Sequence, residues 1–259
     1  MRGMKTSYVF LAILCLLVFA SVSQAAGIAD TKHNLSSTGT GSINTSGTTE
    51  ICVFCHTPHG SDTAVAAPLW NRAVTTSTYT MYNSPSIDGT IDAQPTGVSQ
   101  ACLSCHDGTI AFDALRNLPG SGGFSNAPSA AGVTSWIFAN AGDKKMPGDR
   151  VANLGMDLTN DHPISIDYAS AASPSSSSGV NSHATGFKDP TGTISSTGDT
   201  YFSNGLKLVA GKVQCNSCHD PHRSDNATFL RIDSTGGGSG GVGGNNGSAV
   251  CLTCHQKDA

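Results

Sequence analysis

One five-residue pattern, Cys-x-x-Cys-His, occurs four times in this chain and is its strongest chemical signal. Two cysteines at this spacing can form thioether bonds to the two vinyl groups of one porphyrin. The histidine that follows then lies under the iron as an axial ligand. The pattern is therefore typical of covalent attachment of c-type haem. The four copies are Cys52-Val-Phe-Cys55-His56, Cys102-Leu-Ser-Cys105-His106, Cys215-Asn-Ser-Cys218-His219 and Cys251-Leu-Thr-Cys254-His255.

Two other chemistries use paired cysteines, namely structural zinc and disulfides. Zinc ribbons pair two Cys-x-x-Cys units about 15–20 residues apart, whereas the gaps between successive pairs here are 47, 110 and 33 positions. A disulfide framework gives no role to the histidine after each pair, although only 9 of the 259 residues are histidine. The sequence therefore predicts four covalently bound haem c groups, held by eight thioether cysteines and by the proximal ligands His56, His106, His219 and His255.

Five histidines remain outside the motifs, and four irons need four distal ligands. His59 and His222 occur in matching contexts, Cys-His56-Thr-Pro-His59 and Cys-His219-Asp-Pro-His222, and this repetition predicts the same role for both. Each lies only three residues after a proximal histidine, so it cannot easily reach the opposite face of that porphyrin. We therefore expect both to ligate neighbouring irons, which would bring the porphyrins close together.

Two more histidines are predicted distal ligands. His162 lies in an Asp-His-Pro turn between apolar flanks, where the alternative is a structural turn residue. His33 lies in a polar N-terminal arm, where the alternative is a solvated side chain. His183 borders a Ser-rich segment and is expected not to bind iron. Histidine thus fills all four positions without methionine, and two imidazoles generally give a lower reduction potential than one imidazole and one methionine.

Residues 1–26 have the features of a secretory signal peptide. Arg2 and Lys5 precede an apolar run from Tyr8 to Ala20, and Ser-Gln-Ala-Ala offers small residues for cleavage. The run is shorter than the roughly 20 apolar residues of a membrane-spanning helix. Bacteria attach haem c outside the inner membrane, so we expect an exported protein, at the outer surface or extracellular and otherwise in the periplasm. The ninth cysteine, Cys15, would leave with the signal.

Composition restricts both the fold and the partners. The net charge is −4, and removal of residues 1–26 would take away two of the 14 basic residues and none of the 18 acidic ones. An acidic chain without a basic patch excludes a nucleic-acid partner. Aromatic residues make up only 6% of the chain and 30 residues are glycine, so side chains alone would form a weak core. Four buried porphyrins would replace much of that core.

The predicted fold class is mostly irregular coil with short helices and a few short strands, as in a multihaem cytochrome c built around a haem chain. Residues 27–259 are predicted to form a single tetrahaem domain. It comprises haem pair one (27–113), an insert (114–200) and haem pair two (201–259). Residues 206–214 predict a short β-hairpin that leads into the third motif.

Several segments of this chain resemble one known family. The doubled Cys-x-x-Cys-His pattern is similar to that of the multihaem cytochromes of metal-reducing bacteria, and within them to the small tetrahaem outer-surface cytochromes that polymerise into conducting filaments. The other matching segments are Lys-His33-Asn-Leu-Ser, Cys-His-Thr-Pro-His59, Asp-His162-Pro-Ile-Ser and Cys-His-Asp-Pro-His222. The resemblance implies low-spin bis-histidine haems in alternating stacked and T-shaped contacts. It also implies subunits joined end to end, with one distal histidine donated by the next subunit, although related soluble members are periplasmic shuttles.

Three functions remain open at this stage. The favoured one is electron transfer through a head-to-tail filament of copies, from redox partner cytochromes towards extracellular acceptors such as metal oxides. The second is a multihaem reductase of a small oxyanion, which needs an open iron and acid–base groups. The third is a monomeric periplasmic electron shuttle. Spare histidines exceed the vacancies, so the sequence favours electron transfer over catalysis.

The N-terminal arm suggests how copies would join. His33 lies close to the predicted cleavage site, on a polar arm with few apolar anchors to its own core. We therefore expect His33 to complete a haem of the adjacent copy, in a heterologous contact that does not close.

The eight motif cysteines predict a stoichiometry. Intact-mass analysis of the processed protein should show four haem additions, and no thiol should react with maleimide after denaturation. A reactive thiol, or fewer than four haem additions, would contradict the assignment of all four motifs.

Overall fold

The computed structural model describes residues 27–87, 89–118, 136–172, 186–233 and 249–255. Most of these residues form turns and irregular coil, and the helices and strands are short. The predicted fold class, mostly coil with short helices and a few strands, is therefore confirmed. The predicted signal peptide and His183 lie outside the described residues. None of the helices in the described ranges has the length and apolar character needed to cross a lipid bilayer.

Four of the helices coincide with the haem motifs. A helical turn places residues i and i+3 on one face, so the two cysteines of each motif share a side of their helix. Isolated helices of this length are unstable in water, so tertiary contacts must hold them. The four are η2 (Cys52–Phe54, a 3-10 helix), α2 (Ser99–His106), α4 (Cys215–Cys218) and α5 (Cys251–Cys254). The remaining helices are η1 (Ile28–Asp30), α3 (Tyr168–Ala172) and η4 (Ala227–Phe229).

A small antiparallel sheet precedes the third motif. Its strands are β1 (Ile166–Asp167), β2 (Asp199–Tyr201), β3 (Lys207–Val209) and β4 (Lys212–Val213), in the order β1-β4-β3-β2. β3 and β4 form the hairpin that the sequence predicts, with Val209 paired to Lys212. Ala210 and Gly211 make the turn with φ of 50° and 76°, the positive values that a two-residue hairpin turn requires. The hairpin leads directly into α4.

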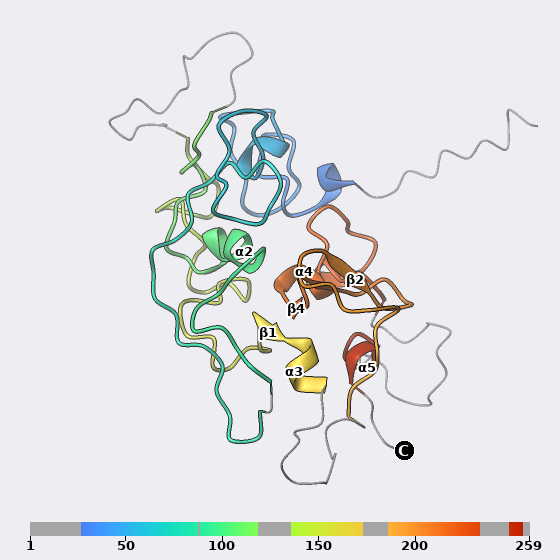
Figure 1. The fold of residues 1–259 in the computed structure, drawn as a ribbon. Helices are drawn as coiled ribbons and strands as arrows, with labels where there is room; N and C mark the ends of the chain where they lie inside the picture. The colour runs from blue at the N-terminus through green and yellow to red at the C-terminus, as the bar shows by residue number, and fades with distance from the viewer. Residues whose placement is uncertain (1–26, 88, 119–135, 173–185, 234–248, 256–259) are drawn as a thin grey trace, which may run out of the picture.

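Two separate hydrophobic cores lie under the two pairs of motifs. The first contains Phe54, Phe112, Trp136, Phe138 and Ala141, and both Cys55 and Cys105 pack against it. The second contains Tyr168, Phe202, Leu206 and Leu208, and both Cys218 and Cys254 pack against it. Figure 1 shows the blue N-terminal segment at one end of the molecule, α2 and α4 near its centre, and α5 farther from that end. Each core thus serves one pair of attachment sites.

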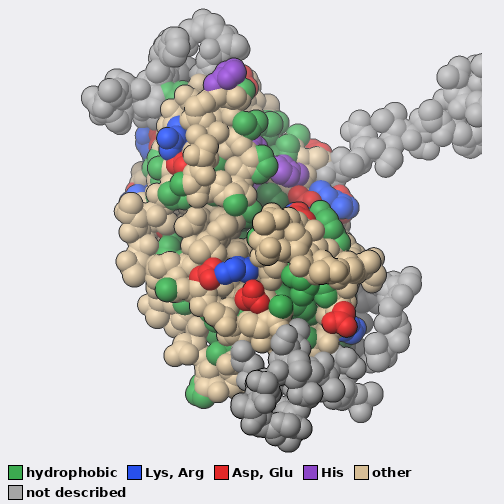
Figure 2. All heavy atoms as spheres, viewed as in Figure 1, with side chains coloured by type: hydrophobic (Ala, Val, Ile, Leu, Met, Phe, Trp, Pro, Cys, Tyr) green, Lys and Arg blue, Asp and Glu red, His purple; other side chains and the backbone are tan. Residues whose placement is uncertain are grey.

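The surface carries few charges, as the composition implies. Figure 2 shows mostly uncharged polar and backbone atoms on one face, with isolated basic and acidic groups. Lys207 lies 2.6 Å from the carboxylate of Asp199, and Lys144 lies 2.7 Å from Asp113. One side chain of each pair is largely buried and the other is partly exposed, so both pairs lie at the edge of the packed interior.

The N-terminal arm is packed on its own chain, contrary to the expectation that it lacks anchors. Thr31, Asn34 and Ser36 are fully buried. The amide of Asn34 donates to the carbonyl of Ala29 at 2.9 Å, and the hydroxyl of Ser36 donates to Asn34 at 2.6 Å. Leu35 and Ile43 of the same arm pack against the first hydrophobic core.

Gly47 offers a test of packing in the first core. A Cβ atom at Gly47 would overlap the indole ring of Trp136, which is itself buried. Gly47→Ala should therefore lower the free energy of unfolding by about 1–3 kcal/mol, measured by urea denaturation of the haem-loaded protein. Gly148→Ala is the matched control because nothing lies within 4 Å of its Cβ position. The control should be neutral or slightly stabilising, and equal losses in both variants would contradict the packing argument.

Candidate haem-binding sites

The motif cysteines form a row that follows the order of the chain. Cys55 and Cys105 contact the same core, as do Cys218 and Cys254. Between the two pairs, the thiols of Cys102 and Cys215 are hydrogen-bonded to each other. Each attachment site therefore lies next to the following one. This spatial order was not predictable from the motif spacing, because 110 positions separate Cys105 from Cys215.

A buried polar junction holds the two pairs together at this point. The Ser99 hydroxyl, at the start of α2, donates to the side-chain oxygen of Gln214 and accepts the backbone N–H of Cys215 at 3.1 Å. Gln214 also caps α4, since its backbone N–H donates to Ser217 at 2.9 Å. The Ser165 hydroxyl donates to the same Gln214 oxygen at 3.4 Å. These bonds fix α2 against α4, which Figure 1 shows near each other at the centre of the molecule.

The proximal histidines are oriented by backbone carbonyls. In His56, His106 and His219 the ring nitrogen Nδ1 lies 2.7, 2.7 and 2.8 Å from the carbonyl oxygens of Pro68, Ala152 and Thr228. A carbonyl can only accept, so Nδ1 carries the proton and Nε2 keeps its lone pair. This is the tautomer that a metal-binding histidine uses.

Three distal candidates show the same arrangement at Nδ1. The ring of His33 faces the carbonyl oxygen of Pro221 at 3.3 Å, and His162 faces that of Pro163 at 2.9 Å. Nδ1 of His222 lies 3.5 Å from the carboxylate of Asp220. Together with the three proximal residues, six predicted ligands present Nε2 for metal binding. The sequence did not predict these partners, because five of the six are backbone carbonyls, which leave no signature in the residue type.

The histidines meet in three pairs, each joining a motif histidine to a predicted distal ligand. The ring centres are 6.0 Å apart for His33–His106, 6.0 Å for His56–His222 and 6.3 Å for His162–His255. A metal–nitrogen bond is about 2 Å long, so two imidazoles that share one ion have ring centres about 6 Å apart. The three separations fit one iron between each pair.

The histidine pairs bear on two expectations from the sequence, one for His222 and one for His33. His222 lies opposite His56 rather than His219, so it faces a motif other than its own, as its position in the chain requires. His33 lies against His106 of its own chain, held by Pro221 and stacked on Phe229 at 4.4 Å. In this structure His33 thus faces a motif histidine of its own chain, and Leu35 beside it packs against the first hydrophobic core.

His59 and His219 have no imidazole partner among the described residues. Both side chains are exposed. The backbone of His59 is fixed, since its carbonyl accepts from the Thr57 hydroxyl at 3.0 Å and from the Asn117 amide at 2.7 Å. Figure 2 shows histidine side chains at separate points of one face. His183, the one other histidine, lies outside the described part of the chain.

The electrostatics of the paired histidines favour the neutral ring. Burial, assisted by the neighbouring His106, lowers the pKa of His33 to about 4. Burial also lowers the pKa of His106 and of His255, and His162 adds to the effect on His255. A neutral imidazole is the form that binds metal, so these rings are ready to bind at neutral pH.

The polar surroundings of the first motif also fit a haem. The indole N–H of Trp70 is buried and has no acceptor in the described part of the structure, and its ring lies 6.4 Å from that of His56. A haem carries two carboxylates, which are acceptors of the kind this N–H lacks. Bound there, haem would supply an iron that exchanges single electrons. Across the four motifs, the residues that would hold haem groups are the eight motif cysteines and the paired histidines.

The first motifs of the two pairs share one local structure. After Cys-His-x-Pro-His the chain turns back, and the backbone N–H groups of Asn71 and Arg231 donate to the carbonyls of Cys55 and Cys218 at 2.9 and 2.8 Å. The residue two positions earlier has a positive φ in both copies, 54° at Leu69 and 61° at Phe229. In each copy this returning strand also carries the carbonyl that orients the proximal histidine. The chain therefore contains a structural repeat that the repeated Pro-His pattern only partly reveals.

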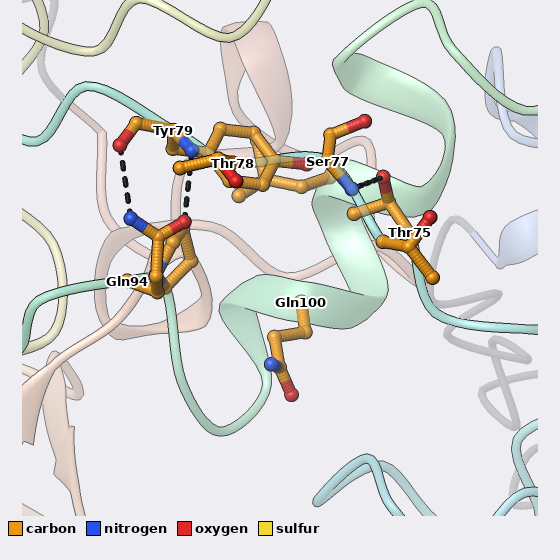
Figure 3. Close-up of a pocket in the computed structure, with 9 residues that line it drawn as sticks. Thr75, Ser77, Thr78, Tyr79, Gln94 and Gln100 are labelled. Atoms are coloured by element: carbon orange, nitrogen blue, oxygen red, sulfur yellow. Dashed lines mark hydrogen bonds between the residues drawn. The ribbon is translucent and has the colours of Figure 1, made fainter.

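A polar hollow of about 300 Å³ lies beside α2, apart from the motif cysteines. Gln100 and Leu103 line it, on a different face of the helix from the cysteines. Figure 3 shows the Gln94 amide bonded to both backbone groups of Tyr79, at 2.8 and 3.0 Å. The lining holds hydroxyl and amide groups but no motif cysteine or histidine, so this hollow does not fit haem.

Among the described residues, no group of three or more His, Cys, Asp or Glu side chains converges in the way that a bare metal ion needs. The histidines come in pairs instead, which suits an iron whose other four ligands belong to a porphyrin.

Comparison with known proteins agrees with this geometry. A family model described as the doubled CXXCH motif matches residues 207–259, which contain the third and fourth motifs. No curated protein matches the chain. The motifs indicate covalently bound c-type haem, and the family match supports a multihaem c-type cytochrome that transfers electrons.

Proposed function

We propose that this protein is a tetrahaem c-type cytochrome that conducts electrons through a row of closely spaced haems. The observation that carries the proposal is the continuity of the attachment sites, above all the contact between Cys102 and Cys215. Adjacent thioether sites bring the edges of adjacent porphyrins together. Electron transfer needs no substrate at the iron, so the protein's part is to set spacing, axial ligands and dielectric.

The axial ligands follow from the histidine pairs. His222 completes the iron of His56, His33 that of His106, and His162 that of His255. These three irons are bis-histidine and low-spin. The fourth iron, bound by His219, takes its second ligand from elsewhere, because no described imidazole of the same chain faces it.

The fourth ligand is His59 of a second copy. His59 is exposed on a backbone fixed by Thr57 and Asn117, and His219 is exposed as well. A donor on one copy and a vacancy on the next make a heterologous contact, which repeats without closing and builds a filament. The filament would carry electrons from redox partner cytochromes to extracellular acceptors, consistent with the predicted export. His59 thus replaces His33 as the proposed connector.

A second function rests on the same vacancy. If no second ligand reached the iron of His219, that iron would be open to a small ligand, as a reductase of nitrite or a similar oxyanion requires. A monomer with three bis-histidine haems and one open haem is the chemical alternative to the filament. The spectrum of the assembled protein under carbon monoxide separates the two, because carbon monoxide binds an open iron and not a bis-histidine one.

Removal of His222 should open one iron. The His222→Ala variant should contain one high-spin haem that binds carbon monoxide, because the imidazole 6.0 Å from His56 is gone. Absorption spectra of the ferrous protein with and without carbon monoxide measure the change. Arg223→Ala, at the exposed neighbouring residue, is the control and should keep the spectrum of the unmodified protein. An unchanged spectrum in His222→Ala would contradict the proposed pair.

Removal of His59 should prevent assembly. His59→Ala should give monomers in which the iron of His219 binds carbon monoxide, observed by negative-stain microscopy and absorption spectra. His33→Ala should open a different iron and leave filaments intact, because its partner His106 lies in the same chain.

His183→Ala tests the competing ligand for that iron. Filaments with four low-spin haems are expected in this variant. If His183→Ala opens an iron and His59→Ala does not, the ligand comes from the same chain and the proposed connector is wrong.

A further inference from the structure

Arg72 is a fully buried cation whose partners are all neutral. Its Nε donates to the Ser104 hydroxyl at 3.2 Å and its Nη1 to the carbonyl of Phe112 at 2.7 Å. Its Nη2 donates to the carbonyls of Ser104 and Ala111 at 3.1 and 2.8 Å. Among the residues that the structure describes, no carboxylate pairs with this guanidinium. The hydrogen bonds satisfy four of the five N–H donors, and no anion among the described residues contacts the guanidinium to neutralise its charge.

The cation lies between the attachment sites of the first two haems. Ser104 belongs to the second motif, where it separates Cys102 from Cys105. The residue before Arg72, Asn71, donates its backbone N–H to the carbonyl of Cys55 in the first motif at 2.9 Å. One buried charge therefore lies beside two haem attachment sites.

The second pair of motifs has an arginine in a corresponding place, because the Nε of Arg231 donates to the carbonyl of Asn216 in the third motif at 2.7 Å, but this arginine has a carboxylate partner. Thr253 occupies the place of Ser104 in the fourth motif, and its hydroxyl accepts from the neutral amide of Asn204. The arginine near the third motif, Arg231, is neutralised by the carboxylate of Asp220 at 3.2 Å. The two halves share local structure but differ in charge.

The acidic groups near the first pair have partners of their own. Asp107, buried beside His106, accepts from the Tyr79 hydroxyl at 2.6 Å and from the Thr109 hydroxyl at 2.8 Å. Asp113 is bonded to Lys144 at 2.7 Å. Asp107 offsets part of the positive field at the second motif, whereas the pair of Asp113 and Lys144 carries no net charge. No hydrogen bond or ion pair between described residues joins Asp107 to Arg72.

We propose that Arg72 raises the reduction potentials of the two N-terminal haems, so that they are reduced before the two C-terminal haems. A haem iron gains one electron on reduction, with no bond made or broken, and the electron comes from the redox partner or an electrode. A nearby positive charge stabilises that added negative charge, and the effect is strong where water is excluded. The inference rests on the proposed electron-transfer function, to which it adds a direction of flow. Because Arg72 is buried, salt should screen it little.

The test is a redox titration of the haem-loaded protein, followed by absorption spectra. Arg72→Met, which removes the charge and keeps an apolar stem, should shift about half of the titration curve to lower potential. Arg72→Lys keeps the charge and should largely restore the curve. Arg116→Met is the matched control, because that arginine is 44% exposed and paired with Asp62. Its curve should overlay that of the unmodified protein.

Two results would overturn the proposal. If Arg72→Met has four haems and an unshifted curve, the cation does not set the potentials. If Arg72→Lys shifts as far as Arg72→Met, packing rather than charge is responsible.

If the Arg72 variants fail to fold or to bind haem, the unmodified protein still provides a test of the proposal. NMR of the haem methyl groups during stepwise reduction should show the first pair reduced first, at low and at high salt. Reduction of the C-terminal pair first would contradict the proposal. The electron-transfer function is tested separately, by a count of four haems and by reversible reduction. Failure of that function can therefore be told apart from failure of the Arg72 proposal.

Discussion

An imidazole binds iron only if one ring nitrogen is aimed at a fixed point, and in this protein backbone carbonyls in irregular segments aim several of the rings. The carbonyls of Pro68, Ala152 and Thr228 each hold a proximal ring by Nδ1. A carbonyl in a helix or sheet is already used by its ladder, so carbonyls free for this purpose occur in turns and returning strands. The scarcity of regular structure therefore follows from the number of rings that must be held.

The same requirement ties distant segments together. The turn from Asp220 to Phe229 orients His219 and supplies His222 opposite His56, while Pro221 and Phe229 hold His33. One ten-residue segment thus contacts three of the four haem sites. A change in this turn would disturb several irons at once, whereas the hydrophobic cores each support only one pair.

The two halves are alike in geometry and unlike in charge. Both first motifs are followed by a strand that returns to the motif carbonyl, but only the N-terminal half encloses an arginine without an anionic partner in the described chain. The shared backbone geometry after each of these motifs fixes the distances between redox sites. A buried charge would set the energy of an electron at each nearby site, and the proposed direction of electron flow rests on this asymmetry.

The sequence by itself determined the chemistry. Residue type and spacing decide whether two thioethers and an axial imidazole can form. Both are local properties that can be read directly from the Cys-x-x-Cys-His motif. The coil-rich fold class and the hairpin before α4 also followed from local signals, namely composition and turn residues. The sequence also showed that His59 and His222 are alike, because each directly follows a proline in a Cys-His-x-Pro-His segment.

Only the tertiary structure decided which histidine faces which, since pairing depends on where loops far apart in the chain come together. It separated His222, which faces His56, from His59, which faces no described imidazole, although their sequence contexts match. It also placed His33 on its own chain, through buried Asn34 and Ser36, and Arg72 between two motifs. Polar anchoring and backbone carbonyl contacts carry no hydrophobic pattern, and for that physical reason the sequence alone could not reveal them.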